Sequence, residues 1–455
     1  MPTKKELTTT VLDELRRAQK EKWTPPKSGR VGILDFPPAL ALGNGKRVMA
    51  TQELQRAIFD YAKLCWDNDP ATKTRFKFNE FVQLVENAFA KTLAKADFDR
   101  PSADLAGEVS KEVLELVDSD IRNHKRRIEL TVGCHLFEGD AAYPIRIGPV
   151  LFETREQFRQ RLAANGKLSP ITTRRLKAIW SGEPRGARKP SADSHTEDAI
   201  LRAIGDCPVA CTIETDGLSS KNVKEKGLLA ARLAMAALSL MWERPSKGLE
   251  LMKLLYDRQW SSRFTVTFGS GKYPGSSSSK SDFPFGHRID DELTSYLTDH
   301  QSLLDQIGEA LSSYVKPSDP VERPTVMNAI VMSLMWFHEA TREPLDQIAV
   351  TKYAASMDTL VGGKGAGAIV ELFSARLGCE PNDQLFKDGH TAKGVINEIY
   401  NDRRSRLIHG SSGDFSHDWA QIRSRAEVVA RLCLTSSCDW LFSHKNCDSL
   451  EAMRS

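Results

Sequence analysis

The sequence of 455 residues has no apolar run long enough to cross a membrane. The apolar run from Leu228 to Trp242 falls short of the roughly 18 uncharged residues that a spanning helix needs, and Arg232 interrupts it. The N-terminal stretch from Met1 to Leu7 lacks the apolar segment of a secretory signal. We therefore expect neither a transmembrane helix nor a secreted protein.

Closely spaced cysteines and an excess of one charge are also missing. The eight cysteines are scattered along the chain, which predicts reduced thiols in a cytoplasmic protein rather than a disulfide framework. The 63 Lys and Arg residues nearly balance the 60 Asp and Glu residues. Overall charge therefore does not indicate a nucleic-acid binder, and any such role must come from local basic patches.

A chain of this length is too long for one ordinary core, so we expect two or three domains. The residue pattern predicts the α+β class with a multidomain organisation. Residues 1–205 predict an N-terminal mixed region of helices and strands. Residues 206–290 predict a small α/β segment and a flexible linker, which we assign to the same recognition region. Residues 291–455 show no strand pattern, and they predict an all-α bundle.

The spacing of apolar residues predicts the individual elements. Helices are expected at residues 4–22, 51–66, 76–96, 105–121, 157–180 and 224–242. Strands are expected at residues 128–132, 145–152, 210–215 and 263–268, the last followed by a flexible Gly/Ser-rich connection. Residues 181–198 predict a mobile loop. The C-terminal helices are expected at residues 291–314, 325–340, 345–361, 366–377, 391–408 and 418–442.

Two short basic stretches are candidates for holding RNA. One runs from Arg122 to Arg127, and the other runs from Arg185 to Lys189 inside the predicted loop. Several cations in a short span supply the salt-sensitive phosphate attraction that RNA binding needs. The alternative is that both stretches are ordinary solvated surface, which is the commoner role of a charge run.

The helix predicted at residues 391–408 carries the residues with the most distinctive chemistry. Its apolar stripe comprises Val395, Ile396, Ile399, Tyr400 and Leu407. Beside the stripe stand Arg403, Arg404, Ser405 and Arg406, and His409 and Gly410 follow. RNA cleavage without a metal needs a base for the 2'-hydroxyl proton and cations for the charge on the phosphate. Histidine titrates near neutrality, and arginine keeps its charge and matches phosphate oxygens.

An Arg, a small polar residue, three variable residues and a His closed by Gly resemble the HEPN superfamily motif, and the surroundings resemble its Apea-like branch. That branch shares the pairs Ile399-Tyr400 and His409-Gly410 with this chain. Residues 356–360 loosely match its Ala-Leu-Glu-like element, with Asp358 in place of Glu, and residues 371–376 match its helix with a Phe and an Arg. The resemblance covers roughly residues 325–442.

The resemblance implies a homodimeric, metal-independent endoribonuclease without a cofactor, which releases a 2',3'-cyclic phosphate. His409 would act as base or acid, Arg404 would bind the phosphate, and Ser405 would support them as a polar neighbour. Tyr400, Arg406 and Arg376 are the expected substrate-binding residues. Proteins of this kind often serve as bacterial toxins or anti-phage effectors. The N-terminal region would then recognise the RNA, a partner or a phage-derived trigger. The alternative is a catalytically inactive HEPN protein that binds nucleotide or only dimerises.

Helix geometry constrains how this site can form. Residues five apart lie roughly 140° apart around an ideal helix, so Arg404 and His409 do not share one face. Either the helix stops at Gly410 and frees His409, or two copies of the helix form a composite site about a two-fold axis. Arg403 projects into the apolar stripe, where it reaches the same cleft or pairs with a carboxylate such as Asp358. We rank Arg404 first because Ser405 follows it.

Other patterns favour structural roles. An Arg and a His at a helix C-terminus often only complement the helix dipole, which is the plain alternative for the motif itself. The glycines of residues 362–367 lack the full phosphate-loop spacing and predict an interhelical turn. A polar turn is favoured over a metal site for Cys134, His135, Glu138 and Asp140. Cys207 and Cys211 are expected to be packing residues, so no metal is predicted.

Overall fold

The computed structural model describes residues 2–20, 39–41, 47–123, 127–138, 142–257, 262–266, 275–279, 287–288, 291–413 and 415–455. The chain divides into two compact units, one of Met1–Ile128 with Asp216–Glu225 and one of Glu129–Thr215 with Lys226–Ser455. This division differs from the boundaries at residues 205 and 290 drawn from the sequence. The chain is mostly helical, with a small antiparallel sheet and a C-terminal helical region, which agrees with the α+β class.

The first unit is built from helices with one apolar face each. It contains α1 (Lys4–Lys20), α2 (Gln52–Asp67), α3 (Pro70–Arg75), α4 (Phe78–Leu93) and α5 (Ser102–Asn123), with the short hairpin β1 (Ala39–Ala41) and β2 (Arg47–Met49). Thr51 caps α2 by accepting a hydrogen bond from the Leu54 amide at 3.1 Å. In the core the rings of Tyr61 and Phe89 meet edge to face, with centroids 5.0 Å apart.

The second unit contains a five-stranded sheet in the order β5-β6-β7-β3-β8. The strands are β3 (Ile128–His135), β5 (Ile145–Ile147), β6 (Val150–Thr154), β7 (Val209–Thr215) and β8 (Lys253–Leu254). The single strand predicted at residues 145–152 is wrong, because Gly148, at φ 54°, turns the chain and makes β5 and β6 a hairpin. Pairing of β3 with β8 joins segments on both sides of the boundary predicted at residue 205, which explains why the compact units do not follow it.

Two small strand pairs accompany this sheet. β4 (Phe137–Glu138) pairs with β11 (His287–Arg288), and β9 (Ser262–Val266) pairs with β10 (Gly275–Ser279). The connection predicted as flexible after residue 268 is therefore a strand over Gly275–Ser279. Residues 267–274 lie outside the described part of the chain.

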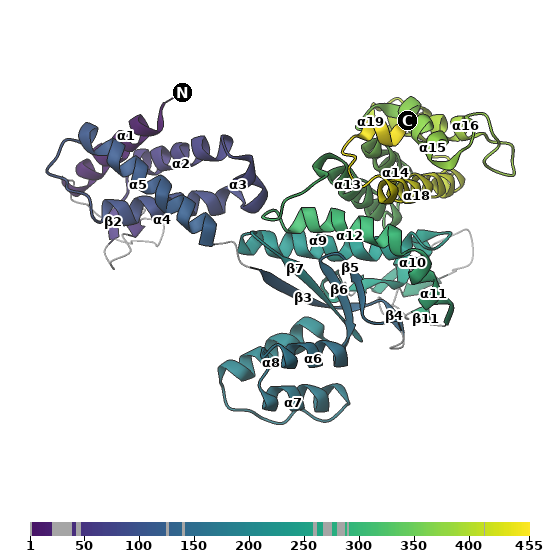
Figure 1. Ribbon diagram of the computed structural model, residues 1–455, viewed down its shortest axis with the longest axis horizontal. Coiled ribbons are helices and arrows are strands. Elements are labelled where there is room, and N and C mark those ends of the chain that lie inside the picture. The colour runs from purple at the N-terminus through teal and green to yellow at the C-terminus, as the bar shows by residue number, and fades with distance from the viewer. Residues whose placement is uncertain are drawn as a thin grey trace. The chain divides into compact units, whose positions relative to one another are not determined.

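Helices cover both faces of the sheet (Figure 1). α6 (Arg155–Ala164), α7 (Pro170–Trp180) and α8 (Ala192–Ile204) lie on one side. On the other side lie α9 (Ser220–Ser239, from Lys226 onward) and α12 (Gln301–Val315). The one helix predicted at residues 157–180 is wrong, because Gly166 at φ 68° ends α6 and Ser169 caps a new helix. The loop predicted at residues 181–198 is wrong in its second half, where Ser191 caps α8.

The C-terminal region is a helical bundle. Its helices are α11 (Asp291–Asp299), α12 (Gln301–Val315), α13 (Pro324–Thr341), α14 (Asp346–Leu360), α15 (Gly365–Leu377), α16 (Ala392–Asn397), the π-helix η3 (Glu398–Ser405), α17 (Arg406–Ile408), α18 (Ala420–Ser443) and α19 (Leu450–Arg454). α14 packs between α13 and α18. The helix predicted at residues 291–314 is two helices that meet at His300, and α19 was not predicted. None of the helices described is both long and apolar enough to span a lipid bilayer.

The short helix α10 (Pro245–Leu251) precedes β8, and the 3-10 turn η2 (Leu255–Asp257) follows it. The Glu427 carboxylate on α18 accepts hydrogen bonds from the amide and hydroxyl of Ser246 at 2.6 and 3.1 Å. Gly308 on α12 passes so close to the β5–β6 turn that a Cβ there would lie 2.6 Å from the amide nitrogen of Gly148. The bundle is therefore seated on the sheet by two facing glycines.

We predict that Gly308→Ala destabilises the protein, because the added Cβ would clash with the backbone of Gly148, which cannot move aside as a flexible side chain can. The expected loss is about 1–3 kcal/mol in the free energy of unfolding, measured in urea. Gly367→Ala is the matched control, since its Cβ meets nothing within 4 Å and α15 should gain up to about 1 kcal/mol. Equal stability of both variants would contradict the close seating of α12 on the hairpin.

Candidate functional site

The helix that carries the candidate residues is continuous from Ala392 to Ile408, but its middle is a π-helix. Thr391 caps its start by accepting from the Gly394 amide at 3.1 Å. Val395, Ile396 and Ile399 are fully buried and anchor the helix against the bundle. The wider π turn spans Glu398–Ser405 and therefore includes Arg403 and Arg404. Such widened turns are rare and are frequently found at functional sites.

The helix stops where the sequence predicted. Gly410 adopts φ 69°, its amide donates to the Leu407 carbonyl at 3.2 Å, and the Ser411 amide donates to the Arg406 carbonyl at 2.9 Å. This pair of hydrogen bonds is a Schellman motif. His409 is the C-terminal cap residue, and its side chain is exposed. The imidazole therefore stands at the end of the helix in solvent, where it can reorient.

Arg404 lies flat on the neighbouring Tyr400. Its guanidinium carbon is 4.8 Å from the ring centroid, and Nη1 is 3.5 Å from the Tyr400 hydroxyl. That hydroxyl donates to Oδ2 of Asp358 at 3.0 Å, and Oδ1 of Asp358 accepts from the Gly365 amide at 3.0 Å. Burial and the Asp358 carboxylate raise the pKa of Tyr400 above 10.0, which keeps the hydroxyl protonated as the donor. Asp358 thus orients Arg404 through Tyr400.

The guanidinium of Arg404 keeps hydrogen-bonding capacity. Its Nε is buried and has no hydrogen-bond partner among the described residues. The residue as a whole is only partly buried, and it forms no ion pair with a carboxylate among the described residues, so its charge is suited to an anion such as a phosphate. No hydrogen bond or ion pair joins Arg404 to His409 within the described chain, so one copy of the helix does not assemble the pair by direct contact.

Arg403 points to a different set of groups. Its guanidinium carbon lies 5.0 Å from the ring of Trp419, which is 1% exposed, and Nη2 lies 3.5 Å from Oε1 of Glu398. The other Glu398 oxygen lies 3.5 Å from Nη1 of Arg425, which in turn pairs with Asp388. Arg403 thus pairs with a carboxylate, as one of the two alternatives predicted, and this carboxylate is Glu398, whereas Asp358 was the example named from the sequence. This arrangement favours a positioning role for Arg403.

The remaining predicted site residues divide into near and distant ones. The Ser405 carbonyl accepts from the His409 amide at 3.0 Å, and exposed Arg406 lies 3.4 Å from Asp402 on the same helix. Arg376 instead lies on Trp440, with its guanidinium carbon 5.0 Å from the ring centroid. Trp419 and Trp440 stand at opposite ends of α18, roughly 30 Å apart at the helical rise. The structure therefore does not bring Arg376 to the motif within one copy of the chain.

Glu398, Trp419 and Arg425 were missed as neighbours of the motif. The pairing of Glu398 with Arg403 could have been considered from the sequence, because Glu398 precedes Arg403 on the same predicted helix. Trp419 and Arg425 come from α18, and only the packing of that helix against the motif reveals them.

A mostly apolar cavity of about 640 Å³ opens beside Asp358. It lies between the start of α13, the end of α14 and α19, and its lining includes Asn328, Met332, Thr359 and Leu450. The interhelical turn predicted at residues 362–367 is confirmed at its start, with Gly362 and Gly363 at positive φ, whereas α15 already begins at Gly365. Gly362 and Gly363 also line the cavity.

Large apolar side chains are exposed next to the motif. Ile408 is 54% exposed and directly precedes His409, and Phe415 follows five residues after Gly410 at 52% exposed. Leu345 is also exposed, and the neighbouring Gln347 donates to the Phe415 carbonyl at 2.9 Å. Exposed apolar groups of this size at a polar motif mark a surface suited to association.

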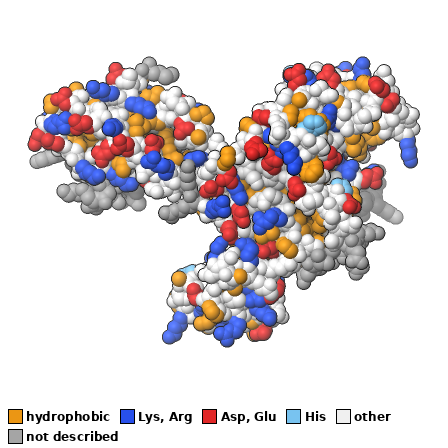
Figure 2. Space-filling model, in the orientation of Figure 1, with side chains coloured by type: hydrophobic (Ala, Val, Ile, Leu, Met, Phe, Trp, Pro, Cys, Tyr) orange, Lys and Arg blue, Asp and Glu red, His pale blue; other side chains and the backbone are white. Residues whose placement is uncertain are grey.

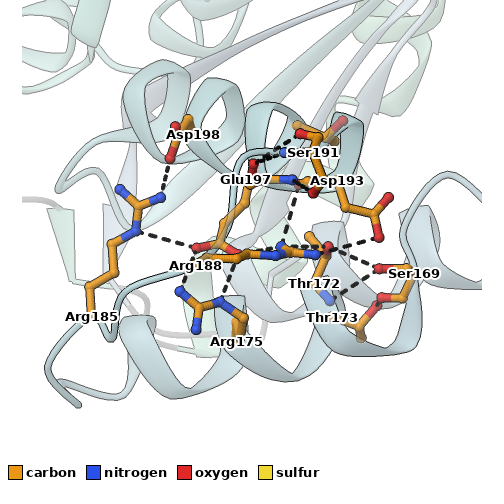
Figure 3. A network of polar contacts seen from close by, with 12 residues as sticks. Ser169, Thr172, Thr173, Arg175, Arg185, Arg188, Ser191, Asp193, Glu197 and Asp198 are labelled. Carbon is orange, nitrogen blue, oxygen red and sulfur yellow. Dashed lines mark hydrogen bonds and ion pairs between the residues drawn. The ribbon is translucent and has the colours of Figure 1, made fainter.

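The basic stretch from Arg185 to Lys189 is held in place rather than mobile (Figure 3). Arg175, Arg185 and Arg188 converge on Glu197, whose side chain is fully buried, with distances of 2.8, 3.3 and 2.7 Å. Arg185 also pairs with Asp198. Two of the three cations in this stretch thus already neutralise carboxylates.

The other basic stretch, from Arg122 to Arg127, includes residues 124–126, which lie outside the described residues. On the face shown in Figure 2, positive and negative side chains are interspersed over both units.

We predict that Glu197→Gln destabilises the protein by on the order of 2 kcal/mol at pH 7, because three arginines lose their anionic partner. The loss is moderate because the three arginine side chains are partly exposed to solvent. The Arg175 hydrogen bond, opposed by burial, lowers the pKa of Glu197 below 4.5. Its contribution is therefore present above pH 4.5 and is lost as the pH falls through the folded-state value.

Urea unfolding at several pH values measures this difference, and the gap between wild type and variant should close in acid. Asp198→Asn is the control on the same helix, and it should cost less than about 1 kcal/mol as a surface pair. A gap that stays constant down to pH 3 would contradict the role assigned to Glu197.

Comparison of the chain with known proteins identifies no relative. No known protein family matches the chain, and no curated protein and no solved structure is similar to it. The arrangement of Arg404, Tyr400, Asp358 and His409 is accordingly the basis on which its function is argued.

Proposed function

We propose that the chain is a metal-independent endoribonuclease that acts through Arg404 and His409. The observation that carries the proposal is the guanidinium of Arg404, held on Tyr400 five residues before an exposed histidine. A fixed cation and a freely oriented imidazole are the two groups that phosphodiester cleavage without a metal requires. The resemblance of the motif to Apea-like HEPN domains supports the same activity.

In the proposed reaction His409 takes the proton of a ribose 2'-hydroxyl. The 2'-oxygen then attacks the adjacent phosphorus and the bond to the 5'-oxygen breaks. The leaving oxygen takes up a proton from water, and His409 afterwards returns to solvent the proton that it took. The products are a 2',3'-cyclic phosphate and a free 5'-hydroxyl. Arg404 balances the charge that develops on the phosphate oxygens, and Ser405 and Arg406 lie beside it as polar and cationic neighbours. The cavity next to Asp358 offers a place for a base flanking the cleaved bond.

The active form in this proposal is a homodimer. Arg404 and His409 make no direct contact in one copy, and the exposed Ile408 and Phe415 border the motif. A two-fold association through this surface would bury the apolar groups and place Arg404 of one copy near His409 of the other. Arg376 lies on Trp440 and would have to act from outside this cleft.

We further propose a cytoplasmic toxin or anti-phage effector, in which the region before the bundle recognises the RNA, a partner or a phage-derived trigger. This role comes from the resemblance alone. A catalytically inactive dimerising protein is the competing outcome of the experiments below.

We predict that Arg404→Ala and His409→Ala each lower the rate of RNA cleavage at least about 100-fold, because each removes one half of the catalytic pair. Cleavage is measured on labelled RNA in excess chelator, with the cyclic phosphate end identified by mass. Arg404→Lys should recover only part of the loss, because lysine lacks the planar fork.

The control is His444→Ala. His444 is also an exposed histidine that caps a helix in this bundle, but it lies on Trp440 at the far end of α18. Its removal should leave cleavage unchanged. RNA binding without cleavage by the wild type, or equal activity in all variants, would contradict the proposal.

We predict that the full chain sediments at twice its mass of 50.7 kDa. Ile408→Asp and Phe415→Asp should shift it to monomer, because a buried unpaired charge opposes association. Ile171→Asp is the matched control, since Ile171 is 55% exposed on α7, away from the bundle. A wild-type monomer at assay concentration, or dimers that withstand both bundle substitutions, would refute this interface.

A further inference from the structure

A second group of chemically active side chains lies in the sheet region, remote from the bundle in sequence. His135 ends β3, and Asp206 and Cys207 lie in the turn between α8 and β7. Their potential ligand atoms, one imidazole nitrogen, one carboxylate oxygen and one sulfur, all lie within 4.8 Å of one another. Cys207 is buried, His135 is half-buried and Asp206 is exposed, so the cluster reaches from the core to the surface.

Two glycines bring the turn onto the strand. A Cβ at Gly133 on β3 would lie 2.3 Å from the carbonyl oxygen of Ile204, the last residue of α8. Gly205 turns the chain at φ 58°, and a Cβ there would lie 2.8 Å from the Leu255 side chain. His135 stands two residues after Gly133 and therefore on the same face of β3. Glycine at positions 133 and 205 thus allows Asp206 and Cys207 to lie beside His135.

Arg155 fixes the shape of that turn. Its Nε donates to the Cys207 carbonyl at 2.6 Å, and its Nη2 donates to the Gly205 carbonyl at 2.9 Å. The guanidinium carbon also lies 5.7 Å from the ring of Trp180. Both carbonyls that flank Asp206 are thereby held by one rigid side chain. Arg155 thus holds the backbone of the turn in the conformation that presents Asp206 and Cys207 to His135.

We propose that His135, Asp206 and Cys207 form a binding site for a divalent transition metal of the zinc type. Nitrogen, carboxylate oxygen and thiolate sulfur are the ligand set that zinc accepts, and hard ions such as magnesium disfavour sulfur. Ligand atoms on a tetrahedral zinc lie about 3.3–3.8 Å apart, so small rotamer changes close the cluster around an ion. The two anionic ligands balance the charge of the ion, and a water completes the fourth position.

The metal would have a consequence that is independent of RNA cleavage. It would tie the end of β3 to the α8–β7 turn and so stabilise the sheet region against unfolding. The sequence does not show this ligand set, because His135 and Cys207 are 72 positions apart. The potential ligands near His135 in sequence are Glu138 and Asp140. Of those two, Asp140 lies outside the described residues.

The test is titration of cobalt(II) into the full chain after treatment with a chelator. Cobalt bound to a thiolate gives an intense charge-transfer absorption in the near ultraviolet. We expect one cobalt per wild-type chain with this band, and zinc should displace the cobalt. Cys207→Ala should abolish the band, and Asp206→Asn should weaken cobalt affinity at least about tenfold without affecting folding, since Asp206 is exposed.

Cys211→Ala is the matched control. Cys211 is another buried cysteine on the adjoining strand β7, outside the cluster, and its variant should keep the wild-type band. The far-ultraviolet circular dichroism of each variant shows that it is folded. A wild type without the band, a band that persists in Cys207→Ala, or unchanged affinity in Asp206→Asn would overturn the proposal.

Discussion

The hydrogen bond from the Tyr400 hydroxyl to Asp358 is the interaction on which the candidate site depends. It fixes the ring on which Arg404 lies, and the same carboxylate holds the start of α15 through the Gly365 amide. The π turn of η3 places this tyrosine and arginine one above the other while Arg403, their neighbour, turns toward Trp419 and Glu398. The adjacent residues Arg403 and Arg404 therefore have different surroundings. Arg403 is half-buried between the Trp419 ring and the Glu398 carboxylate, and Arg404 lies over the Tyr400 ring.

Local patterns predicted much of the fold, and tertiary contacts supplied the rest. The helices α13 to α15 and α18 follow from apolar residues at helical spacing, because a helix with one buried face carries that spacing wherever it packs. The hairpin at Gly148, the break at Gly166 and the start of α8 were missed, since a single turn residue overrides an otherwise continuous apolar pattern. The compact units were not predictable, because they depend on β3 pairing with β8 across a hundred residues.

The candidate site shows the same division. The helix stop at Gly410 and the exposure of His409 are local properties, and the sequence predicted them. The partner of Arg403 and the distant position of Arg376 depend on which face α18 presents, which no local pattern encodes. Likewise, the stretch from Arg185 to Lys189 was predicted to lie in a mobile loop, because its sequence does not reveal that Arg185 pairs with Glu197 on α8. The His135, Asp206 and Cys207 cluster is a still longer-range product of packing.

The central claim is that each active site is shared between two copies of the chain, with Arg404 from one copy and His409 from the other. Mixing the inactive Arg404→Ala and His409→Ala proteins tests it most directly, with RNA cleavage in chelator as the measurement. If Arg404 of one copy works with His409 of the other, mixed dimers contain one intact site. The mixture should then regain roughly a quarter of the wild-type rate, because half of the dimers are mixed and half of their sites are whole. No recovery in a mixture shown to exchange subunits would contradict the shared site.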